Sequence, residues 1–155
     1  MKKKYMKFIV VGVLVIAIVI VFLVFRKKDI MIESIKKFNF FYDTGWSIDT
    51  NARYSIKCTD KCIAIIKPNN ISEEEMLEKE VDDDFINQLI GILNKYKVSR
   101  WDGFNKVDKM VLDGNSFSLS VSFNDDKHIS AHGYMKWPKN YSEVKSELDT
   151  LFMDI

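Results

Sequence analysis

The chain has 155 residues, of which 47% are hydrophobic and 29% are charged, and its formal net charge is +1 at pH 7. Residues 1–28 hold seven of the 23 Lys+Arg and none of the 22 Asp+Glu, so residues 29–155 carry a net charge of −6. A mildly acidic domain without a basic stripe argues against a nucleic-acid partner and against a domain that lies flat on anionic lipid.

The first predicted element is an apolar run at residues 8–25, FIVVGVLVIAIVIVFLVF. A helix of this length rises about 27 Å, close to the roughly 30 Å hydrocarbon core of a bilayer. A cleavable signal peptide would have a shorter apolar region and a small-residue cleavage site, whereas this run ends at Val-Phe-Arg-Lys-Lys. We therefore predict a membrane anchor in residues 1–28, with a transmembrane helix at 8–25 that contacts the lipid bilayer.

The basic residues on the two sides of this run leave the orientation nearly balanced. Lys2, Lys3, Lys4 and Lys7 precede it, and Arg26-Lys27-Lys28 follow it. A short tail with four lysines is costly to translocate, whereas a long folded domain crosses largely regardless of charge. We therefore expect a single-pass signal-anchor protein of the cell membrane with its C-terminal domain outside, and the reversed, cytosolic orientation is the alternative.

After the anchor we predict a linker at 29–34 and one domain at 35–155, which has the size of a typical domain. Residues 38–45, 52–58 and 62–67 alternate or are rich in β-formers and read as strands. Residues 71–81 stay ambiguous between a short helix and an edge strand. Ser72 and Glu75 fit a capping box, but 76–81 could equally pair with a sheet.

Two amphipathic helices complete the predicted domain. The first begins at Asp82-Asp83-Asp84, which we interpret as a cap, and its apolar stripe comprises Phe85, Ile86, Leu89, Ile90, Leu93 and Tyr96. The second follows Pro138, with a cap pair at Asn140 and Glu143 and inward-facing Tyr141, Val144, Leu148, Leu151 and Phe152. The fold class predicted is α+β, an antiparallel sheet with two helices packed on one face.

The stretch SFSLSVSFNDDKHISAHGYM, at 116–135, reads as a hairpin whose serines and histidines share one face. We expect Phe123 to face Ile129, which pairs Ser120 with His132. His128 and His132 would lie about 13 Å apart, too far to share one zinc ion. No serine sits on a strained elbow of the kind a nucleophile needs. The sequence therefore predicts a solvated face with no catalytic residue, no metal and no cofactor.

Cys58 and Cys62 bracket a turn in CTDKC. If they face each other across a three-residue loop, their Cβ atoms come within disulfide range. If the register shifts by one residue, they lie on opposite faces and stay free thiols. Both interpretations remain open.

Large aromatic residues gather near loops and strand ends in the C-terminal half. Trp101, Tyr134 and Trp137 are the candidate binding residues, because rigid rings commonly dominate interfaces. The alternative is that they close the rim of a small core.

The elements RWDGF, VLDGNSF and GYMKWPKNY resemble a family of small, uncharacterised, membrane-anchored or lipoprotein bacterial domains, mostly from Gram-positive organisms. This resemblance implies a location outside the membrane and brings no known activity. The leading functional hypothesis is a membrane-anchored extracytoplasmic binding or interaction domain with a protein or cell-envelope partner. The alternatives are a cell-envelope hydrolase and a cytosolic-facing accessory subunit of a membrane complex. Nothing in the sequence requires an enzyme.

Overall fold

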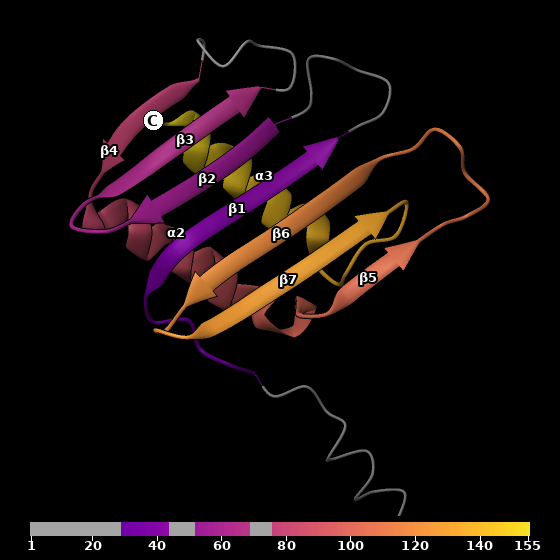
Figure 1. Ribbon diagram of the computed structural model, residues 1–155, viewed down its shortest axis with the longest axis horizontal. Helices are drawn as coiled ribbons and strands as arrows, with labels where there is room; N and C mark the ends of the chain where they lie inside the picture. Colours follow the sequence, from indigo (N-terminus) through magenta and orange to yellow (C-terminus); the bar gives the residue numbers. More distant parts are fainter. Residues whose placement is uncertain (1–28, 44–51, 69–75) are drawn as a thin grey trace, which may run out of the picture.

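The computed structural model describes residues 29–43, 52–68 and 76–155. They form a seven-stranded mixed sheet in the order β4-β3-β2-β1-β6-β7-β5, and both α-helices lie on one of its faces (Figure 1). The elements are β1 (Ile35–Asp43), β2 (Ala52–Cys58), β3 (Cys62–Pro68), β4 (Leu77–Val81), α2 (Asp83–Lys95), the 3-10 helix η3 (Val98–Trp101), β5 (Phe104–Val107), β6 (Ser116–Phe123), β7 (Lys127–Tyr134) and α3 (Tyr141–Met153).

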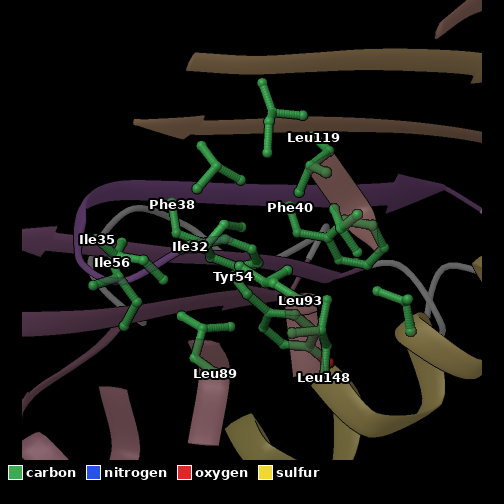
Figure 2. Packing of buried hydrophobic residues seen from close by; sticks show 14 of the residues in the cluster. Ile32, Ile35, Phe38, Phe40, Tyr54, Ile56, Leu89, Leu93, Leu119 and Leu148 are labelled. Carbon is green, nitrogen blue, oxygen red and sulfur yellow. The ribbon is translucent and has the colours of Figure 1, made fainter. Parts of the chain in front are cut away.

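The core lies between the sheet and the two helices. In β1, Phe38, Phe40 and Tyr42 alternate with outward residues and are 6% exposed or less. Side chains from β1 and β2 point toward Leu93 of α2 and Leu148 of α3 (Figure 2). Because β1 pairs with both β2 and β6, its inward aromatic residues form the centre of this core.

The two predicted helices are confirmed. The side chain of Asp82 accepts a hydrogen bond from the Phe85 N–H over 2.9 Å, so it caps α2 as expected. Leu89 and Leu93 are fully buried on the predicted stripe. The predicted cap pair of α3 is wrong, because Asn140 has a φ of 63° and its side chain makes no capping hydrogen bond.

The predicted antiparallel sheet is corrected to a mixed sheet, because β5 runs parallel to β7. The sequence Asp102-Gly103 reads as a loop, and four residues are too few for an alternating pattern to be recognised. The loop is tied to β7 at both residues: Asp102 Oδ1 accepts from the Ser130 N–H over 3.0 Å, and the Gly103 N–H donates to the Ser130 carbonyl over 2.8 Å. These contacts place the chain at the edge of β7, and it continues in the same direction.

The predicted anchor, residues 1–28 with its helix at 8–25, lies outside the described residues. Within the part of the chain that is described, no helix is long and apolar enough to cross a membrane. Helices α2 and α3 have 13 residues each, and each buries one face against the domain. The predicted transmembrane, signal-anchor and single-pass membrane assignments therefore find no support in this structure and are set aside.

The hairpin of β6 and β7 has the predicted faces but a different register. Phe117, Leu119, Val121 and Phe123 are buried with Ile129 and Ala131. Val121 instead of Phe123 pairs with Ile129, so the predicted register is wrong by two residues. The cause is a tight turn in which Asn124 and Asp125 adopt positive φ values of 43° and 67°. Asparagine and aspartate tolerate this conformation better than other non-glycine residues.

The remaining ambiguities concern β2, β3 and β4. The register of β2 against β3 pairs Cys58 with Cys62, and the two form a disulfide bond. Of the ambiguous stretch, Leu77–Val81 forms the edge strand β4, which pairs with β3. Residues 71–75 lie outside the described part of the chain.

Candidate functional site

The connection between β7 and α3 presents a tryptophan ring to solvent. Trp137 is 38% exposed. Its inner side stacks on Tyr141, with ring centroids 4.5 Å apart and planes at 22°, and it also contacts Phe117 at 5.6 Å. The next residue, Pro138, is buried and restricts the backbone. The ring is therefore held firmly on one side and open on the other.

Trp101 is buried and contacts the two rings that Trp137 packs on, Phe117 and Tyr141. It is 3% exposed, and its ring centroid lies 6.1 Å from that of Phe117 and 6.2 Å from that of Tyr141. Its Nε1–H donates to the Lys139 carbonyl over 3.1 Å, which fixes the connection that carries Trp137. The structure thus brings Trp101 and Trp137 together around shared neighbours.

Tyr134 does not join these two rings. It pairs with Ser116, whose side chain lies on the face of the sheet that carries no helix. Its hydroxyl donates to the Leu112 carbonyl over 2.7 Å, which ties down the loop between β5 and β6. Of the three candidate binding residues, two therefore share one site and the third lies on the other face.

Trp137 and Pro138 line two pockets. The first, here called the tyrosine pocket, has a volume of about 480 Å³. The second, here called the basic pocket, has a volume of about 330 Å³. The tyrosine pocket is lined by Tyr42, Asp43, Asn115, Trp137, Pro138, Asn140, Tyr141, Ser142, Glu143 and Lys145. The basic pocket is lined by Tyr96, Lys97, Arg100, Trp101, Phe104, Lys106, Trp137, Pro138, Lys139 and Asn140. Both volumes fall within the range of roughly 300–1,000 Å³ that is typical of small-molecule sites.

Two residues that line the tyrosine pocket, Tyr42 and Lys145, belong to a polar cluster. Asp149 of α3 accepts hydrogen bonds from the hydroxyls of Tyr42 over 3.1 Å and Tyr54 over 2.8 Å. The Lys145 ammonium lies 2.7 Å from Asp149 Oδ2 and 3.9 Å from the centroid of the Tyr42 ring. One carboxylate therefore joins two strands to the last helix.

Two members of this cluster, Tyr54 and Lys145, have raised pKa values. Burial, followed by the hydrogen bond with Asp149, raises the pKa of the Tyr54 phenol far above its ordinary value. Burial alone would lower the pKa of Lys145, but the hydrogen bond to Asp149, the charge of that carboxylate and the contact with Tyr42 together outweigh burial and raise the pKa. At neutral pH these two groups therefore stay protonated and donate hydrogen bonds to Asp149, and neither is placed to act as a general base.

Sequence reasoning missed Tyr42, Tyr54 and Asp149 as a unit. The spacing of Lys145 and Asp149, four residues apart on a predicted helix, was a signal for their ion pair. Nothing in the sequence indicated that two phenols from different strands would meet the same carboxylate.

The serine and histidine face carries no comparable cluster. His128 and His132 are exposed on the uncovered side of the sheet, and the Ser122 hydroxyl lies 3.4 Å from His128 Nδ1. In the described ranges, no group of three or more His, Cys, Asp or Glu side chains is placed to hold a metal ion.

No family model matches the chain, and no curated protein sequence matches it. The resemblance to small bacterial domains therefore stays a prediction.

Proposed function

We propose that this domain is a binding module that holds its ligand at Trp137 and the pockets beside it. The observation that carries the proposal is the 38% exposure of a tryptophan ring whose other side is packed on Tyr141. A rigid ring loses little conformational entropy when a ligand packs on it, and such rings often dominate binding energies.

The chemistry of the neighbouring groups favours binding over turnover. Burial and the hydrogen bond with Asp149 raise the pKa of Tyr54, and the contacts with Asp149 and Tyr42 raise that of Lys145 against the effect of burial, so both groups stay protonated. Trp137, Pro138 and Tyr141 supply an apolar wall, and Ser142 and Asn140 add polar groups at the rim. An apolar wall with a few polar groups is the usual composition of a small-ligand site.

The test uses the full chain labelled with 5-fluorotryptophan. The sequence has three tryptophans, so three fluorine resonances are expected, and each is assigned by a single Trp→Phe variant. The labelled protein is screened against a library of neutral and charged ring fragments. We expect bound fragments to shift the Trp137 resonance more than the other two.

The variant Trp137→Leu keeps an apolar side chain against Tyr141 and removes the flat ring. It should lose at least about 2 kcal/mol of fragment binding while circular dichroism shows the fold intact. The matched control is Met153→Ala, which removes another exposed apolar side chain, 77% exposed and outside both pockets. Fragments that bind Trp137→Leu as well as the original protein would refute the proposal.

A further inference from the structure

The two pockets beside Trp137 differ in charge. The charged residues that line the tyrosine pocket are Asp43, Glu143 and Lys145. The basic pocket is lined by four cations and by no carboxylate: its charged lining residues are Lys97, Arg100, Lys106 and Lys139. This concentration lies in a domain whose residues 29–155 carry a net charge of −6. General surface composition therefore does not account for it.

The four cations come from three separate parts of the fold. Arg100 lies in η3, and Lys97 directly precedes that helix. Lys106 lies on β5, and Lys139 lies in the connection to α3. Asp29 is paired with the first two: its carboxylate lies 3.1 Å from Lys97 Nζ and forms two contacts with the Arg100 guanidinium. Lys106 and Lys139 form no ion pair with any described residue. The pocket thus keeps an excess of positive charge after Asp29 is counted.

The same pocket has aromatic walls. Tyr96 and Phe104 are half-buried, Trp101 is buried, and the exposed ring of Trp137 stands at its border. The Lys106 ammonium lies 5.5 Å from the centroid of the Phe104 ring, so charge and ring are already adjacent. A flat ligand ring would find aromatic surface here, and a negative group attached to it would find ammonium and guanidinium donors.

We infer that the basic pocket binds a small aromatic anion, a flat ring that carries a phosphate or carboxylate group. This inference rests on the proposed function, since Trp137 borders the pocket, and it names the ligand class. The volume of about 330 Å³ accommodates one or two rings with one anionic group. Positive charge and ring surface act on the same ligand, so a probe needs both parts to bind well.

The experiment compares five probes on the fluorotryptophan-labelled full chain. They are phenyl phosphate, benzoate, benzyl alcohol, benzylamine and inorganic phosphate. We expect phenyl phosphate and benzoate to bind, the neutral ring and inorganic phosphate to bind more weakly, and the cationic ring to bind least. Binding of the two anionic rings should weaken in 0.5 M salt, at which charges on the rim are screened over about 4 Å. The ratio of phenyl phosphate to benzoate affinity distinguishes a phosphate ligand from a carboxylate ligand.

Charge-removing variants locate the site. The double variant Lys106→Gln/Lys139→Gln should bind phenyl phosphate at least about fivefold more weakly, and Lys109→Gln, an exposed lysine outside the pocket, should not change the affinity. Asp29→Asn should act in the opposite direction. It removes one negative charge beside Lys97 and Arg100 and so raises the net positive charge of the basic pocket, and phenyl phosphate should bind about threefold more tightly.

The outcomes separate this inference from the proposed function. If phenyl phosphate binds no better than benzyl alcohol, or if the double variant binds it unchanged, the basic pocket is not an anion site and the inference is overturned. If Trp137→Leu still weakens the neutral ring in that case, the proposed function stands without it. If the double variant loses phenyl phosphate and Trp137→Leu does not, the anion site stands and the role of Trp137 is refuted.

Discussion

The side-chain amide of Asn94 forms two hydrogen bonds with the backbone of Ile32, donating to its carbonyl over 2.8 Å and accepting from its N–H over 2.9 Å. Asn94 lies near the end of α2, 62 residues further along the chain. The amide satisfies a backbone donor and acceptor as a neighbouring strand would. Ile32 is 1% exposed, so the segment 29–34, predicted as a linker, packs against the domain here.

Replacing Asn94 with alanine should destabilise the domain. The change removes both partners of a buried segment, and an unsatisfied backbone group costs about 1–3 kcal/mol. We expect a loss of that size in the free energy of urea unfolding. Limited proteolysis should also cut near Ile32 faster, because the segment is released first.

The matched control is Asn87→Ala on the same helix, where the side chain is exposed. Alanine is the better helix former, so this variant should be neutral or slightly more stable. Equal stability of the Asn94 and Asn87 variants would show that the contact with Ile32 contributes nothing.

Two glycine-to-alanine changes should have opposite signs. A Cβ at Gly133 would lie 2.1 Å from the Lys136 carbonyl oxygen and 2.5 Å from the Phe117 ring, so backbone or ring must shift. Overpacking of this kind typically costs 1–3 kcal/mol, and we expect about that loss for Gly133→Ala. A Cβ at Gly91 in α2 meets nothing within 4 Å, so Gly91→Ala should gain about 0.5–1 kcal/mol. Urea unfolding measures both, and a stable Gly133→Ala would contradict the packing described around Phe117.

The parts of the fold that follow from local patterns could be predicted from the sequence. The stripe through Leu89 and Leu93 repeats with the helical period, and the run Asp82-Asp83-Asp84 predicts the cap, which the structure assigns to Asp82. The faces of β6 also follow from alternation. The register of its hairpin does not, because it depends on whether Asn124 and Asp125 adopt positive φ, which a face pattern does not determine.

Features that need distant residues to meet could not be predicted. β5 is short, and its parallel pairing depends on contacts between Asp102 and Ser130, which are far apart in the sequence. The candidate site likewise depends on residues that are distant in the sequence. The sequence suggested Trp137 as a binding residue, but the charge of the basic pocket arises only when η3, β5 and the connection to α3 come together.

Acid should weaken the attachment of Asp29. Hydrogen bonds from Arg100 first and then from Lys97 lower the pKa of this carboxyl from its ordinary 3.8 to about 2. A lowered pKa contributes stability that is present above pH 4 and is lost as the pH falls toward 2. The effect is small, because these side chains are about 40% exposed or more.

The comparison of Asp29→Asn with the original protein isolates this contribution. Urea midpoints measured from pH 7 to pH 2 should show the variant less stable at neutral pH. The difference should shrink between pH 4 and pH 2, where the native carboxyl becomes protonated. A difference that is constant over this range would contradict the ion pair.

Reduction of the disulfide should lower stability modestly. Cys58 and Cys62 close a loop of only a few residues, so the loop-entropy contribution is at the low end, about 2 kcal/mol. Dithiothreitol should therefore lower the urea midpoint of the original protein and leave that of Cys58→Ala/Cys62→Ala unchanged. An original protein that does not respond to the reductant would indicate free thiols at both positions.

Strong base should unfold the domain through Tyr54. Its side chain is 2% exposed, and burial, followed by the hydrogen bond with Asp149, raises the pKa of its phenol. A raised pKa means that the stabilisation is complete below the unfolded value, about 10, and is lost as the pH rises above it, because only the unfolded chain then releases the proton. Urea midpoints should therefore fall between pH 9 and pH 12.

Tyr54→Phe should make this fall of the urea midpoint with pH less steep. Part of the fall will remain in the variant, because burial also raises the pKa of Tyr141. Absorbance at 295 nm should show Tyr54 ionising together with unfolding in the original protein. A phenol that titrates near pH 10 in the folded domain, with the same slope in both proteins, would refute its hydrogen bond to Asp149.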